Sequence, residues 1–153
     1  MVTPVSAAQA NDATMTRTTW AADPRQLPAI RAEARQFLTP LALTQDAKQD
    51  LVFAVSEATS NAIEHAYHPA AVGDTVQLRW WAAPHTLWIE IRDHGQWQIP
   101  SKQPSGRGFG ILLIEQLVGS MAIHHDLYGT RLLLSHPLLP KARALSPTRG
   151  GTR

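Results

Sequence analysis

LVFAVSEATSNAIEHAY, residues 51–67, places a carboxylate, an amide and an imidazole four residues apart, at Glu57, Asn61 and His65. On an α-helix, positions i, i+4 and i+8 lie on nearly one face, so these side chains form a row. The other positions are mostly apolar or small and can pack against a core. They are Leu51, Val52, Val55, Ala58, Ala62, Ile63 and Ala66. The stretch therefore predicts a helix whose polar row borders a cavity.

Two interpretations of this polar row are open from the stretch alone. Polar residues at helical spacing commonly form a solvated face. A carboxylate and an amide also provide hard oxygen ligands, which suit Mg²⁺ better than zinc. Other segments of the chain have to decide between the two.

Composition places the chain among globular proteins of one domain. It has 153 residues, of which 44% are hydrophobic and 17% charged, so one sizeable core is expected. No apolar run is long enough to span a membrane, and the first residues lack a signal-peptide pattern. With no cysteine, disulfides and cysteine-based metal sites are excluded. We therefore expect a cytoplasmic protein without a membrane partner.

Charge gives no reason to expect direct contact with nucleic acid. The formal net charge is +2, and several basic residues are gathered near the C-terminus instead of on one folded element. Residues 1–15 and 141–153 lack sustained periodicity and are expected to be a flexible arm and a flexible tail. The folded domain is therefore predicted to span residues 16–140.

Apolar periodicity and turn residues predict the other elements. Strands are expected at 16–22, 76–80, 87–92, 121–126 and 130–136, and helices at 28–38, 45–67 and 109–118. Thr44 is the expected N-cap of the long helix. Because the strands come in pairs, the fold class is α+β. We expect a two-layer sandwich of a mostly antiparallel mixed sheet with about three helices on one face.

A glycine-rich loop, Gly106-Arg107-Gly108-Phe109-Gly110, precedes an apolar helical run. Glycines let the backbone approach a phosphate closely, and amides at a helix N-terminus favour negative charge. Without a Gly-Lys-Ser/Thr sequence the loop is not a P-loop, and it does not follow a strand as a dinucleotide fingerprint does. Alone, it is equally consistent with a flexible connection.

Asp93-His94-Gly95 ends a predicted strand. Aspartate followed by glycine often only makes a turn. Inside a pocket, the carboxylate can instead accept a hydrogen bond from an exocyclic amine such as that of adenine. The turn is the more common outcome for this motif in isolation.

The order of these motifs resembles a known nucleotide-binding domain, which is shared by histidine kinases, gyrase, a heat-shock chaperone and MutL. The order is Glu-x-x-x-Asn on a helix, Asp-x-Gly after a strand, Gly-x-Gly-x-Gly before a helix, and Gly-Thr opening a strand. With ADPRQLPAIRAEARQFL before LVFAVSEATSNAIEHAY, the chain is most similar to the anti-sigma-factor serine/threonine kinases of bacterial partner-switching systems. The resemblance covers about residues 17–136 and implies the histidine-kinase-like ATPase fold.

The resemblance implies a role for each motif residue, with ATP and Mg²⁺ as cofactors. Glu57 would be the general base, and Asn61 would bind Mg²⁺ at the ATP phosphates. His65 would lie near those phosphates. Asp93 would accept from the adenine amine, and Gly95 would let the base approach.

The remaining motif residues would close the nucleotide site. Gly106, Gly108 and Gly110 would form a lid over the phosphates, with Arg107 as a further contact. Thr130 would support the adenine pocket through its hydroxyl or a water. Phosphoryl transfer needs mainly positioning and charge neutralisation, so such a set suffices chemically.

The resemblance also implies protein partners. The chain would be an ATP-dependent serine/threonine protein kinase that phosphorylates an anti-anti-sigma factor and sequesters a sigma factor. A homodimer is expected as well, because Trp80, Trp81 and Trp88 place indoles on both faces of the predicted sheet. One of those faces is then available to a partner.

Trp97 departs from the family pattern, which usually has a glycine there, two residues after Gly95. This residue keeps an alternative open, in which the chain is a nucleotide-gated binding module without kinase turnover. A third interpretation is the ATPase domain of a sensor kinase, which the absence of a helix with a phospho-accepting histidine disfavours. The histidines, including His124 and His125, lack the spacing of zinc ligands.

Overall fold

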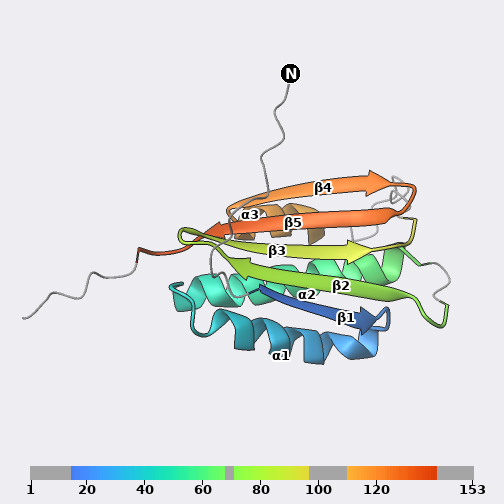
Figure 1. Ribbon diagram of the computed structural model, residues 1–153, viewed down its shortest axis with the longest axis horizontal. Helices are drawn as coiled ribbons and strands as arrows, with labels where there is room; N and C mark the ends of the chain where they lie inside the picture. Colours follow the sequence, from blue (N-terminus) through green and yellow to red (C-terminus); the bar gives the residue numbers. More distant parts are fainter. Residues whose placement is uncertain (1–14, 68–70, 97–109, 141–153) are drawn as a thin grey trace, which may run out of the picture.

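The computed structural model describes residues 15–67, 71–96 and 110–140, which form a sheet layer and a helix layer (Figure 1). The sheet has five strands in the order β1-β2-β3-β5-β4. They are β1 (Met15–Ala21), β2 (Thr75–Ala82), β3 (Thr86–Asp93), β4 (Ser120–Asp126) and β5 (Gly129–Pro137). The α+β prediction is confirmed. All four pairings are antiparallel, so the described sheet lacks the parallel pair of the mixed sheet that we predicted.

The helices lie on one side of this sheet (Figure 1). They are α1 (Leu27–Leu38), α2 (Gln45–His65) and α3 (Gly110–Leu117); a short 3₁₀ helix, η1 (Pro24–Gln26), precedes α1. Thr44 is the N-cap of α2, as predicted, and its Oγ1 accepts from the Ala47 amide at 3.1 Å. Among the described helices, none is long and apolar enough to cross a membrane.

The α2 helix ends at His65, two residues earlier than the predicted end at residue 67. The next carbonyl, that of Ala66, accepts from the Gln96 amide at 3.0 Å, which joins the end of α2 to the segment after β3. A tertiary hydrogen bond has therefore taken up a carbonyl that another helical turn would have used.

The core lies between the two layers. Every residue predicted for the apolar face of α2 is buried, and alternate residues of β2 and β3 face them. Trp80 is fully buried there; its Nε1 donates to Glu33 Oε1 at 2.9 Å, and its ring contacts Phe37 with centroids 5.3 Å apart. The indole thus combines a large apolar contact with a satisfied donor.

The opposite face of the sheet carries no helix among the described residues (Figure 1). Trp81 and Trp88 stack there with centroids 6.1 Å apart, and the Arg79 guanidinium lies 5.3 Å from the Trp81 ring. Glu90 forms ion pairs with Arg79 and Arg131. Indoles therefore occupy both sheet faces, as predicted, while the homodimer stays a prediction.

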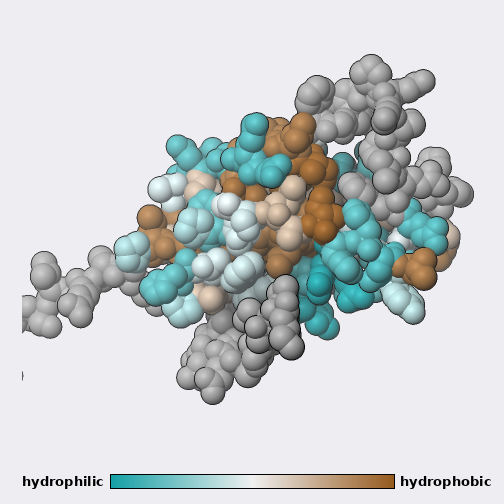
Figure 2. Space-filling model, turned by 90° about the horizontal axis from the view of Figure 1, so that it is seen from above, coloured by the Kyte–Doolittle hydropathy of each residue, from teal (hydrophilic) through white to brown (hydrophobic). Residues whose placement is uncertain are grey.

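A second exposed apolar region is visible from above. Figure 2 looks onto the side of the molecule where β4 lies and shows apolar surface gathered in a band between polar areas. On α3, Leu112 and Leu113 are exposed, while Ile114 is buried against the core. The helix therefore places one apolar side in the core and leaves another at the surface.

Candidate functional site

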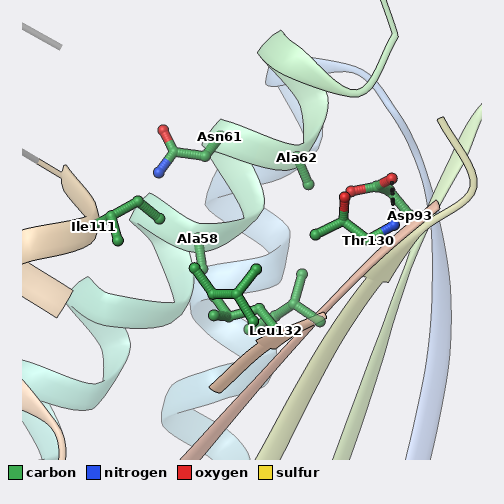
Figure 3. Close-up of a pocket in the computed structure, with 9 residues that line it drawn as sticks. Ala58, Asn61, Ala62, Asp93, Ile111, Thr130 and Leu132 are labelled. Carbon is green, nitrogen blue, oxygen red and sulfur yellow. Dashed lines mark hydrogen bonds between the residues drawn. The ribbon is translucent and has the colours of Figure 1, made fainter. Parts of the chain in front are cut away.

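A cavity lies between α2 and the part of the sheet formed by β3, β5 and β4, with the start of α3 beside it (Figure 3). Its volume is about 20 Å³, enough for roughly one water. A purine base therefore enters only if the walls separate. The lining residues are Ala58, Asn61, Ala62, Ile91, Asp93, Ile111, Ile123, Thr130 and Leu132.

Asp93 is the buried acceptor at one end of this cavity. It is 3% exposed, and its Oδ1 accepts from the amides of Gly95 at 3.1 Å and Thr130 at 3.2 Å. Burial raises the pKa of Asp93, and the two backbone donors offset part of that rise. Its other oxygen, Oδ2, takes part in neither bond and can accept from a ligand amine.

Thr130 lies beside Asp93 because the two residues are partners in the β3–β5 pairing. Figure 3 shows both side chains at the same end of the cavity. The Thr130 hydroxyl is 3.1 Å from Nδ1 of His125 on β4. The preceding residue, Gly129, has φ +135°, and a Cβ there would overlap the Asp93 carbonyl. Glycine at this position lets β5 begin close to Asp93.

Gly95 is packed against the end of α2. A Cβ at this position would overlap the Ala66 carbonyl, so a side chain cannot be added without moving the backbone. The Gln96 amide donates to that same carbonyl at 3.0 Å. The predicted need for glycine here is therefore met by a contact with α2, which holds the loop after Asp93 in place.

Tyr67 provides a second connection between the end of α2 and this loop. Its hydroxyl donates to the Thr75 carbonyl and accepts from the His94 amide, both at 2.8 Å. Burial is the main cause that raises the pKa of Tyr67, which favours the protonated form that this donation needs. We did not predict this role, since nothing in the local sequence shows that Tyr67 reaches β2 and the residue that follows β3.

Glu57 and Asn61 form the other end of the site, where α3 begins. A Cβ added to Gly110 would lie 3.2 Å from Glu57 Oε2 and 3.4 Å from Asn61 Nδ2. The first residue of α3 therefore packs directly against both side chains. An amide and a carboxylate in this position form a hard oxygen donor set, so the residues present fit Mg²⁺.

The three residues of the predicted polar row do not all line the cavity. Asn61 lines the cavity, whereas Glu57 and His65 do not. His65 is the last residue of α2 and half-buried, and its role near phosphates stays a prediction. Gly106, Arg107 and Gly108 lie outside the described residues, as does Trp97. Their proposed roles also stay predictions.

Apolar walls make up most of the cavity, and we did not assign them from the sequence. Ile91 could have been found, because strand alternation places it on the same side as Asp93. Ile111 and Ile123 come from α3 and β4, and only the packing of those elements shows that they face one space. His125 was likewise assigned no role, although it contacts Thr130.

A two-layer domain with a buried carboxylate at one end of a cavity and paired oxygen donors near the other has the polar groups that a nucleotide-binding domain needs. The profile of the histidine kinase-like ATPase domain matches residues 20–136. The chain therefore belongs to the family of histidine kinase-like ATPase domains. Membership implies ATP binding and supports an ATPase or phosphotransferase kind of activity.

Two solved structures resemble the chain. The RsbU and RsbW domains of Rv1364c from Mycobacterium tuberculosis match at 26% identity with a TM-score of 0.60, over 81% of this chain and 32% of that chain. The blue-light activated histidine kinase EL346 of Erythrobacter litoralis matches at 21% identity with a TM-score of 0.54, over 75% and 41%. The second likeness shows the fold alone. The chain spans less than half the length of either structure.

Proposed function

We propose that the chain is an ATP-binding anti-sigma factor with serine/threonine protein kinase activity. It would phosphorylate an anti-anti-sigma antagonist and sequester a sigma factor in a partner switch. The observation that carries the proposal is one site with the buried Asp93 acceptor at one end and the Glu57–Asn61 pair near the other. The likeness to a protein with an RsbW domain supports the choice of partners.

The two ends of the site give the nucleotide a direction. In this proposal, Asp93 Oδ2 accepts from the adenine amine, and the Thr130 hydroxyl contributes beside it. The triphosphate then extends toward Asn61 and Gly110, where the start of α3 approaches α2. The unpaired backbone amides at the N-terminus of α3, next to the phosphates, would favour their negative charge.

Asn61 would hold Mg²⁺ through its side-chain oxygen, beside Glu57. When bound, the metal would neutralise charge on the phosphate oxygens. Asn61 lines the cavity and lies beside the position where α3 begins, which supports this role.

Glu57 would act on the acceptor serine. Its carboxylate would take the hydroxyl proton while the serine oxygen forms a bond to the γ-phosphorus. The bond between that phosphorus and its bridging oxygen would break, and ADP would leave with the electron pair. Glu57 is half-buried beside Asn61, which leaves its carboxylate accessible to a partner.

The test is incubation of the purified chain with labelled ATP, Mg²⁺ and the antagonist encoded nearest to its gene. Label should appear on an antagonist serine or threonine. Glu64→Gln, on the exposed side of the same helix, is the matched control for Glu57→Gln. Absence of transfer, or equal transfer by the Glu57 variant, would contradict the kinase. Retained ATP binding without transfer would support the nucleotide-gated binding module instead.

A further inference from the structure

A groove separate from the nucleotide cavity runs between α1 and α2. Its volume is about 800 Å³, and side chains of both helices line it. On α2 the lining extends from Gln45 to Glu57, a rise of roughly 18 Å at 1.5 Å per residue. Glu57 is the last lining residue along α2, so the groove leads to the residue that we propose as the general base.

The rims of this groove are basic. Arg31 and Arg35 lie on α1 and Lys48 lies on α2, whereas Glu57 is the only acidic residue among those that line the groove. Arg31 Nη1 donates to Ser56 Oγ at 3.3 Å, and Lys48 Nζ donates to the Thr39 carbonyl at 2.8 Å. A lysine ammonium has three donors, so Lys48 keeps further donors for a ligand.

The groove also contains an exposed apolar position. The Phe53 side chain is 42% exposed, and the neighbouring Val52 is buried at 8%. A single exposed apolar residue is ordinary on a protein surface. Here, however, the phenyl ring lies in the same groove as the basic residues, a combination of aromatic and cationic groups that is typical of binding surfaces.

We propose that this groove binds an acidic segment, with one apolar anchor side chain, of the protein that carries the acceptor serine. The proposal rests on the proposed kinase function. Acidic side chains would pair with Arg35 and Lys48, the anchor would cover Phe53, and the serine would then lie at the Glu57 end. The groove thereby selects the substrate before the hydroxyl reaches its base.

Other occupants fit these residues less well. A second copy of the chain would bring the same basic rims against each other, and like charges across an interface are unfavourable. A nucleic acid would meet three cations spread along two helices, with Glu57 repelling its backbone at one end. A protein segment satisfies the charged and apolar positions together.

Direct binding of synthetic peptides tests the proposal without requiring catalysis. The first peptide carries glutamates around one leucine and a terminal serine; the second has glutamine in place of each glutamate, and the third has lysine. Fluorescence anisotropy should show the glutamate peptide binding about tenfold tighter than the glutamine peptide, since several charge pairs formed together add up to about that factor. Equal affinities would overturn the proposal.

A charge exchange makes the test specific to this groove. In the double variant Arg35→Glu and Lys48→Glu, the glutamate peptide should lose its advantage and the lysine peptide should bind better. Phe53→Ala should weaken the binding of both the glutamate peptide and the lysine peptide. Arg17→Glu, on the exposed sheet face, is the control and should leave the preference unchanged. An unchanged preference in the double variant would overturn the proposal. So would a short single-stranded DNA that displaces the peptide and whose own binding depends on Lys48.

Two further measurements separate this proposal from the proposed function. ATP affinity should be the same in the double variant and the wild type, because neither residue lines the nucleotide cavity. Transfer of label to the peptide serine is scored separately. Peptide binding without transfer would contradict the kinase and leave the docking groove standing, whereas transfer without an acidic preference would contradict the groove alone.

Discussion

The two ends of the proposed nucleotide site are held by different parts of the chain. At the Asp93 end, backbone donors from Gly95 and Thr130 fix a buried carboxylate. At the Glu57 end, two side chains of one helix meet the start of α3, with glycine as the contact. In the proposed function, recognition of the adenine base would depend on strand pairing, and phosphate binding would depend on how α3 packs on α2. Mutations at the two ends should separate nucleotide binding from turnover.

Glu57→Gln should have the largest effect, and it should fall on turnover. Removal of a general base lowers the rate of proton transfer by roughly 10²- to 10⁴-fold. ATP affinity should change little, because Glu57 does not line the cavity. Transfer kinetics and calorimetric ATP titration measure the two quantities. If ATP affinity fell as steeply as the rate, the two ends of the site would not separate nucleotide binding from turnover.

Asp93→Asn should act on binding first. The amide oxygen can keep both backbone hydrogen bonds, but its NH₂ group would face the adenine amine. Loss of a hydrogen bond to a charged group should weaken ATP binding by about tenfold to a hundredfold. The melting temperature at neutral pH should be unchanged or higher, because the variant no longer buries an ionised group. A lower melting temperature together with retained ATP affinity would contradict this role of Asp93.

Gly95→Ala and Gly110→Ala each add one methyl group, so their effects on stability can be compared directly. At Gly95 the new Cβ overlaps the Ala66 carbonyl, so the backbone must move and unfolding should be easier by about 1–3 kcal/mol. At Gly110 the nearest atom is Glu57 Oε2 at 3.2 Å, which can adjust, so the effect on stability should be smaller. Chemical denaturation measures both. Equal losses of stability would indicate that the two ends are equally rigid.

The pH dependence of ATP affinity should reflect Asp93. Its pKa lies above the ordinary value of 3.8 because of burial, so affinity should fall as pH decreases through that raised pKa. The stability of the free protein should change in the opposite direction. A raised folded pKa stabilises the protonated form, and that contribution is lost as pH rises through it. In Asp93→Asn both dependences should be flatter, as titration calorimetry and thermal melts can measure.

Trp88→Ser should have the smallest effect on the nucleotide site, because Trp88 lies on the opposite face of the sheet. ATP affinity should change less than about twofold, since distant sites act nearly independently. If the open face joins two copies, the mass measured by light scattering should fall from dimer to monomer. An unchanged dimer would mean that the two copies meet at another surface.

The sequence alone was sufficient for the local features. Apolar spacing located the helices and strands to within a few residues, and Thr44 was correctly predicted as a cap. The family resemblance then identified Asn61 and Asp93, which the structure places around one cavity. Helical and strand periodicity are properties of neighbouring residues, so a linear pattern contains them.

Only the tertiary structure decided which residues share the site. The pairing of β3 with β5 brings Thr130 to Asp93 across 37 positions of sequence, and Tyr67, which follows α2, reaches Thr75 on β2 and His94 after β3. The packing of α3 and β4 places Ile111 and Ile123 in the cavity wall. Asn61 also lines the cavity, whereas Glu57, in the same row of α2, does not. Contacts of this kind come from side-chain packing and strand order across the whole domain, whose free energies no local pattern records.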